Sequence, residues 1–206
     1  MTTRIAPHDS KTRILDAALQ VIRARGYAAS TVDDVCHAAG LTKGSFFHHF
    51  RSKEDLALSA ADYFAARADR LFATAPYRAA ADPVDRLLGY VDFRVGLLRG
   101  ALPQFTCLLG TMVQETYETH PALRAACGRH MGDHVAMLEA DVAEARRLYA
   151  PDAPWSADSV ALFIQSVLQG AFVMAKARGG PEGAIESLGH LRRYLESLFD
   201  RSGRCA

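Results

Sequence analysis

Ten residues from Leu41 to Phe50, LTKGSFFHHF, combine a lysine, a serine and two adjacent histidines with three phenylalanines. The polar side chains of Lys43, Ser45, His48 and His49 can form hydrogen bonds with phosphate oxygens or base edges. The phenylalanine rings belong in a core. The segment therefore needs an element that buries some of the rings and turns the polar groups outward together.

A short helix that begins after Thr42 meets this need. Phe46 and Phe50 are four residues apart, so both would pack inward from one face of such a helix. The remaining face would carry Lys43, Ser45, Phe47, His48 and His49. Gly44 would let the start of the helix approach another backbone closely, and amide groups there favour phosphate. The alternative is a plain aromatic core segment with inconsequential surface histidines.

Two helices that precede this segment are expected to support it. An apolar stripe predicts a first helix of about four turns that ends near Gly26, with Ser10 available as its cap. Thr31 is expected to cap a second helix that Gly40 ends, since glycine adopts positive φ easily. A helix, a tight glycine-containing turn and a further helix make up a helix-turn-helix.

Composition and charge limit the class of protein. Half of the 206 residues are hydrophobic and the mean hydropathy is near zero, which predicts a folded chain. The first residues lack an apolar leader, and Gln165 and Gln169 interrupt the most apolar run, so we expect a soluble cytoplasmic protein without a membrane span. Four cysteines without a CxxC pair indicate reduced thiols.

The net charge of +1 is divided unevenly along the chain. Residues 1–53 hold five Arg and three Lys against four Asp, a balance of +4, and the remainder holds sixteen basic and nineteen acidic residues, a balance of −3. A basic front segment favours a phosphate-bearing partner, although a small excess is also typical of a solvated surface.

Helix signals continue to the end of the chain and predict an all-α fold of about nine helices. One expected helix, over 104–118, contains Cys107, and the last two cover 157–178 and 182–200. Both of these last helices are apolar on more than one face, which predicts a four-helix interface with a second copy of the chain. A deeply buried monomer core is the alternative.

Residues Lys11 to Leu56, KTRILDAALQVIRARGYAASTVDDVCHAAGLTKGSFFHHFRSKEDL, resemble the DNA-binding domain of the TetR family of one-component bacterial transcriptional regulators. The resemblance implies an N-terminal three-helix helix-turn-helix DNA-binding domain, 1–56, and a larger helical effector-binding and dimerisation domain, 57–206. It also implies a homodimer on a near-palindromic double-stranded DNA operator, with one recognition helix per subunit in successive major grooves. No enzymatic activity and no cofactor are expected.

Carried over to this chain, the resemblance assigns DNA contacts. Those assigned to phosphate are Thr31 and Lys53, those at the groove-facing start of the recognition helix are Thr42, Lys43 and Gly44, and those facing bases or backbone are Ser45, Phe47, His48 and His49. Lys43 can read guanine or anchor a phosphate. The family usually has tyrosine where Phe47 stands, so a hydroxyl is lost. Protonation of His48 or His49 in mild acid is expected to strengthen DNA binding.

The resemblance also implies an effector pocket within the middle helices. Residues that could line it are Phe93, Leu97, Cys107, Thr111, Gln114, Tyr117, His134, Met137, Gln169, Phe172 and Lys176. Any of them could instead be ordinary core. We expect a repressor that a small molecule releases from DNA.

Three alternatives remain open at the level of sequence. Cys107 could sense oxidants or electrophiles if Lys176 lowered its thiol pKa. The front module could bind DNA without sequence preference, or the chain could be a helical binding protein without DNA affinity. A zinc site of Cys127, His130 and His134 is disfavoured because three residues spread over two turns of one helix do not converge easily on one ion, and we expect no metal.

Overall fold

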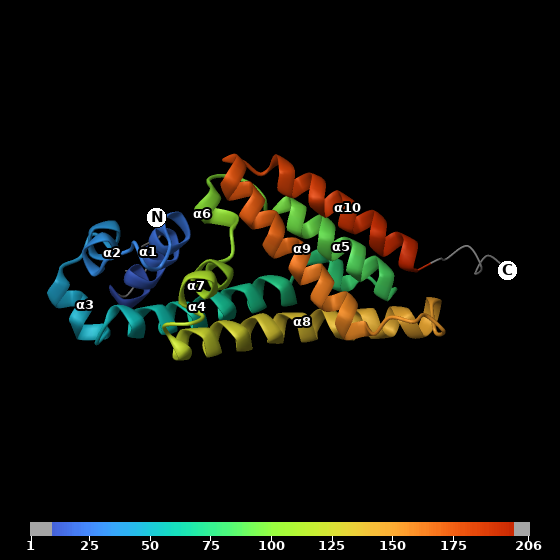
Figure 1. The fold of residues 1–206 in the computed structure, drawn as a ribbon, viewed down its shortest axis with the longest axis horizontal. Helices are drawn as coiled ribbons and strands as arrows, with labels where there is room; N and C mark the ends of the chain where they lie inside the picture. The colour runs from blue at the N-terminus through green and yellow to red at the C-terminus, as the bar shows by residue number, and fades with distance from the viewer. Residues whose placement is uncertain (1–9, 200–206) are drawn as a thin grey trace, which may run out of the picture. The chain divides into compact units, whose positions relative to one another are not determined.

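The computed structural model describes residues 10–199, and within that part of the chain all regular structure is helical (Figure 1). The expected all-α fold is confirmed. The α-helices are α1 (Ser10–Arg25), α2 (Val32–Ala39), α3 (Lys43–His49), α4 (Lys53–Ala73), α5 (Pro83–Gly96), α6 (Leu102–Phe105), α7 (Leu108–Thr116), α8 (Pro121–Tyr149), α9 (Ala157–Arg178) and α10 (Glu182–Leu198), with a 3-10 helix, η1 (Pro76–Ala79), before α5.

The described residues thus form ten α-helices rather than about nine, because the helix expected over 104–118 is divided into α6 and α7. Thr106 has an extended backbone (φ −76°, ψ 157°), and its hydroxyl donates to the carbonyl of Leu102 at 2.9 Å. A threonine that hydrogen-bonds four residues back competes with continuation of the helix. The placement of Cys107 inside a helix is therefore wrong, since it lies in the break between α6 and α7.

The helices gather into two compact units. The first contains the described residues up to Arg67 together with Leu108–Gly128, and the second contains Ala68–Cys107 and the described residues from Arg129 onward. The sequence-based domain boundary between residues 56 and 57 stays a prediction.

In the first unit, local capping sets the limits of α2 and α3 as expected. Thr31 accepts a hydrogen bond from the amide of Asp34, and Thr42 accepts one from the amide of Ser45. Gly40 has φ 61°, and its amide donates to the carbonyls of Cys36 and His37. Helices α1, α2 and α3, the residue that follows α3 and the start of α4 contribute buried side chains. These include Ile14, Ala18, Ile22, Val35, Phe46, Phe50 and Leu56. Ser10 is the first residue of α1.

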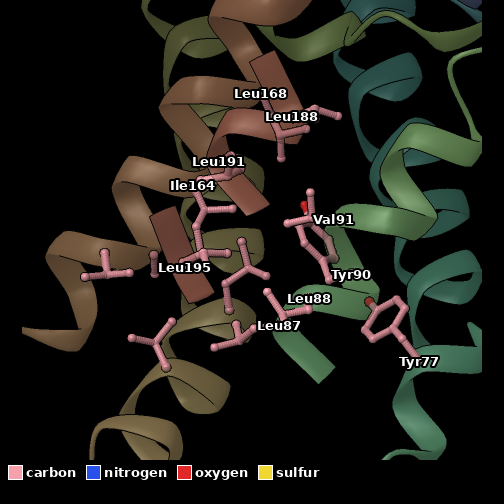
Figure 2. Packing of buried hydrophobic residues seen from close by; sticks show 14 of the residues in the cluster. Tyr77, Leu87, Leu88, Tyr90, Val91, Ile164, Leu168, Leu188, Leu191 and Leu195 are labelled. Atoms are coloured by element: carbon pink, nitrogen blue, oxygen red, sulfur yellow. The ribbon is translucent and has the colours of Figure 1, made fainter. Parts of the chain in front are cut away.

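The second unit is built around a leucine-rich core from α5, α9 and α10. Figure 2 shows the labelled leucines turned toward one another, with Tyr77 and Tyr90 at one side of the group. Helix α10 packs on both α9 and α5. Truncating one such leucine to alanine typically costs about 2–5 kcal/mol of stability, so this unit can position side chains firmly.

Helix α9 is long and apolar enough to cross a membrane by length and composition, and 44% of its most apolar 18-residue stretch is buried. The buried side carries Val160, Ala161, Ile164 and Leu168, which belong to the core of the second unit. Core packing therefore explains the apolar residues on this side of α9.

Candidate nucleic-acid interface and effector region

Two of the three phenylalanines in and just after α3 are buried, and the third is exposed. Phe46 and Phe50 are 0% and 2% exposed, whereas Phe47 is 57% exposed. The ring centroid of Phe46 lies 5.2 Å from that of Phe47 and 5.5 Å from that of Phe50. The expected burial of Phe46 and Phe50 and the expected exposure of Phe47 are confirmed.

The exposed face of α3 begins with Lys43. Its ammonium pairs with the carboxylate of Asp33 at 2.9 Å, and both side chains are well exposed. A surface ion pair of this kind contributes about 0–1 kcal/mol. Lys43 can therefore exchange Asp33 for a phosphate or a guanine edge at little cost.

The two histidines of α3 differ in their surroundings. His48 is exposed, whereas His49 is half-buried and its Nε2 shares a hydrogen bond of 2.6 Å with the hydroxyl of Ser10. The two imidazole centroids are 4.8 Å apart. His49 thus links α3 to the start of α1, while His48, with Gly44 and the half-buried Ser45, remains on the accessible side.

Lys53 binds the turn between α1 and α2. Its ammonium donates to the carbonyls of Ala28 at 3.3 Å and Ser30 at 2.8 Å, and it lies 4.3 Å from the ring centroid of Tyr27. Burial lowers the pKa of Lys53, and the charge of Glu115 opposes that effect. The phosphate contact assigned to Lys53 stays a prediction.

Thr31 is engaged in a capping box with Asp34. Its amide and its hydroxyl donate to Oδ2 of Asp34 at 2.9 and 2.6 Å. These hydrogen bonds lower the pKa of Asp34, and Arg25 adds to the effect. The phosphate contact assigned to the exposed Thr31 also stays a prediction.

Sequence reasoning missed a contact between α7 and the α1–α2 turn. Oε2 of Glu115 accepts a hydrogen bond from the amide of Ala28 at 2.7 Å, and the ring of His120 lies edge-on to Tyr27, with centroids 5.3 Å apart. Gly26 precedes this turn with φ 88°. Partners 87 residues apart leave no local periodic signal in the sequence.

The residues expected to line an effector pocket divide between the two units. Thr111, Gln114 and Tyr117 belong to the first unit, and the other eight belong to the second. Thr111 is buried, Gln114 donates to the carbonyl of Gly110 at 2.7 Å, and Tyr117 is 58% exposed. Their grouping with the second set stays a prediction.

In the second unit most of these side chains contact the core. Phe172 is buried, and those packed against the core in a partly buried state are Phe93, Leu97, Cys107 and Met137. Gln169 and Lys176 are half-buried on α9. The hydrophobic setting agrees with either a pocket wall or an ordinary core.

Tyr90 and His134 form a neutral polar pair in the second unit. The hydroxyl of Tyr90 and Nε2 of His134 are 2.8 Å apart. Burial, with the charges of Arg94 and Arg78, lowers the pKa of His134 to about 3, and burial raises the pKa of Tyr90 to about 12. Both groups are therefore uncharged near neutral pH.

The cysteines form no disulfide at the three positions that the structure describes, Cys36, Cys107 and Cys127. Cys205 lies outside the described residues. Between residues 10 and 199, no group of three or more His, Cys, Asp or Glu side chains is placed to hold a metal ion.

Two family models match the sequence of this chain. The profile described as "Bacterial regulatory proteins, tetR family" matches residues 14–60, and "Tetracyclin repressor-like, C-terminal domain" matches residues 83–191, more than half of the chain. The chain belongs to the TetR family. It is a DNA-binding transcriptional regulator of a non-enzymatic family, as the sequence predicted.

Individual TetR-family relatives agree with this assignment. The chain is 26% identical over 166 residues to the HTH-type transcriptional repressor DhaR of Mycobacterium sp. (strain GP1), covering 81% of this chain and 82% of that one. It is 37% identical over 57 residues to the HTH-type transcriptional regulator YerO of Bacillus subtilis, a match that covers 28% of this chain and only 20% of YerO. A TetR transcriptional regulator from Chloroflexus aurantiacus J-10-FL superposes with a TM-score of 0.80 at 25% identity, covering 92% of this chain and 96% of that one.

Proposed function

We propose that this TetR-family regulator is a cytoplasmic repressor that binds a palindromic operator as a homodimer and leaves it when a small-molecule effector binds. The observation that carries the DNA-binding part is α3. Two fully buried rings, Phe46 and Phe50, fix the helix, and Lys43, Phe47 and His48 stand exposed on it. A rigid helix with an accessible cationic face suits the major groove.

Lys43 is the residue that reads sequence in this proposal. Its surface partner Asp33 is replaceable, and a direct contact with guanine O6 and N7 gives about 1–3 kcal/mol of discrimination. Phosphate contacts from Thr31 and Lys53 would position the helix without reading bases. Thr42 and Gly44 would lie at its groove-facing start, and Ser45, His48 and His49 would face bases or backbone. Phe47 offers an apolar surface for a thymine methyl group.

A second copy of the chain would cover the apolar side of α9 and α10. Large exposed hydrophobic residues gather on these two helices: Leu162, Phe163, Val173 and Met174 on α9, and Ile185 and Tyr194 on α10. Phe163 and Tyr194 already touch, with ring centroids 5.0 Å apart. Exposed apolar patches of this kind are typical of protein interfaces, and twofold symmetry would set the spacing of the two α3 helices.

Effector release needs a ligand with different affinities for two conformations of the protein. A coupling of about 1–3 kcal/mol corresponds to a roughly 5- to 150-fold loss of operator affinity. Helix α7 directly follows Cys107 and holds the α1–α2 turn through Glu115. It is therefore the element that we expect to pass a change in the effector region to the DNA-binding helices.

The decisive experiment measures binding to the regulator's own upstream intergenic DNA against a scrambled duplex at two salt concentrations. We expect preferential binding of the native sequence, lost in Lys43→Ala and kept in Arg124→Ala, which removes an equal charge from an exposed position of the same unit. Equal, salt-sensitive binding to both duplexes would mean that the module only grips phosphate. The regulatory proposal would then be withdrawn.

A further inference from the structure

Arg94 of α5 is an unusual cation in the second unit. It is half-buried, and its guanidinium carbon lies 5.2 Å from the ring centroid of Phe72, 5.9 Å from that of Tyr90 and 5.4 Å from that of Phe172. Among residues 10–199 its guanidinium forms no ion pair and donates no hydrogen bond. Cation–π contacts stabilise its charge, but they leave its N–H donors unused.

Arg78 and Arg86 differ from Arg94, because each of them pairs with a carboxylate. Arg78 pairs with Asp141 at 2.8 Å, and Arg86 pairs with Asp141 and Glu144. The uncharged Tyr90–His134 pair supplies no negative charge to this region. A half-buried cation without a counter-ion is costly, so an anionic partner would be stabilising here.

Tyr77 adds an independent observation. Its side chain is 7% exposed, and its hydroxyl is buried without a hydrogen-bond partner among the residues described. Its ring centroid lies 5.8 Å from those of both Tyr90 and Phe93. Burial raises the pKa of Tyr77, and the charge of Asp141 adds to the rise, whereas Arg78 and Arg94 oppose it.

The Arg78 guanidinium lies over the ring of Tyr77, 5.2 Å from its centroid, but does not reach its hydroxyl with normal hydrogen-bond geometry. A buried hydroxyl left unpaired destabilises the fold. Tyr77 therefore offers an unused donor within electrostatic range of the unpaired Arg94.

We infer that the effector carries a carboxylate, which accepts hydrogen bonds from Arg94 and Tyr77, on a flat apolar body that packs among Phe72, Phe93 and Phe172. This inference rests on the proposed effector-dependent regulation. A carboxylate matches the planar fork of one guanidinium and a single negative charge balances it. A phosphate dianion would leave charge uncompensated, because Arg78 is already paired.

The test compares acids with their uncharged primary amides on the native full-length protein. The probes are 2-naphthoate and benzoate, each against its amide, with affinity measured by calorimetry. We expect at least one acid to bind about 10-fold or more tightly than its amide, since charged hydrogen bonds are about twice as strong as neutral ones. Equal binding of acids and amides, or no acid binding at ~10 mM, overturns the inference.

Substitutions at Arg94 and Tyr77 test which side chains cause the preference for acids over amides. Arg94→Met is expected to abolish the acid–amide difference, and Tyr77→Phe to weaken acid binding about 5- to 10-fold. Arg99→Met is the control, since Arg99 is an exposed arginine close by in the same unit. A folded Arg94→Met protein that keeps its preference for acids contradicts the role of Arg94, and the acid–amide comparison on the native protein remains decisive if that variant does not fold.

The two proposals fail separately. Specific operator binding without any acid preference leaves the regulator in place and removes the carboxylate effector. Acid binding through Arg94 without specific DNA binding establishes the ligand site and removes the regulatory proposal.

Discussion

Removing the Glu115 carboxylate is expected to loosen the α1–α2 turn at one amide. Oε2 of Glu115 accepts from the amide of Ala28 at 2.7 Å, and both residues are exposed at the surface. A hydrogen bond to a charged group contributes about 1.5–3 kcal/mol, and exposure to water reduces this to about 1 kcal/mol. The Glu115→Ala variant should therefore lose about 1 kcal/mol of local stability at Ala28.

Hydrogen exchange measures this loss directly. Because 1.4 kcal/mol corresponds to a factor of ten, the Ala28 amide should exchange about 5-fold faster in Glu115→Ala. Glu118→Ala is the matched control, since it removes an equal charge from an exposed residue just after α7. Specific operator affinity should fall in the first variant and not in the second.

Unchanged exchange at Ala28 in Glu115→Ala would refute the reasoning. It would mean that the hydrogen bond does not protect the turn in solution, and α7 would lose its role in coupling. Equal acceleration in Glu118→Ala would refute it differently, by assigning the effect to general loss of negative charge.

Three further predictions concern stability, each measured by urea unfolding. Phe46→Ala should lower the free energy of unfolding by about 3–5 kcal/mol, and a loss under about 1 kcal/mol would contradict its core position. Gly26→Ala should cost about 1–3 kcal/mol, because φ is 88° and a Cβ would lie 2.2 Å from Oε1 of Glu115, whereas Gly128→Ala, with nothing within 4 Å, should be neutral or stabilising. Acidification from pH 7 to 5 should lower the free energy of unfolding by up to about 2 kcal/mol through His134, because its pKa of about 3 lies below the ordinary value and the unfolded chain binds the proton first. His134→Gln should reduce this dependence of stability on pH, and an unchanged dependence would contradict the burial of the imidazole.

Local rules were enough to predict the DNA-binding helices. The caps at Thr31 and Thr42 and the end at Gly40 depend on residues within four positions, and the burial of Phe46 and Phe50 follows from their spacing. The break after α6 was missed because the apolar pattern continues through it. The hydrogen bond from the Thr106 hydroxyl to the carbonyl of Leu102 lies at this break, but such a bond leaves no periodic signal in the sequence.

The contacts of Lys53 and Arg94 could not be predicted from the sequence, because most of their partners lie far away along the chain. Lys53 reads as a phosphate contact from its position, but its ammonium hydrogen-bonds carbonyls more than twenty residues away. Arg94 was not singled out, because the aromatic rings around it come from α4, α5 and α9. Tertiary contacts of this kind depend on geometry that spacing along the chain does not encode.

The burial of Arg94 also determines how a carboxylate could regulate DNA binding. An anion gains most from Arg94 in conformers that keep the guanidinium half-buried, since water screens the same charge pair once it is exposed. A 10-fold preference for acid over amide corresponds to about 1.4 kcal/mol, which lies within the range of typical coupling energies. If the carboxylate binds the DNA-bound and the released conformers with equal affinity, it shifts nothing. Operator release by an acid, absent with its amide and lost in Arg94→Met, would therefore show that the acid binds the released conformer more tightly and does so through Arg94.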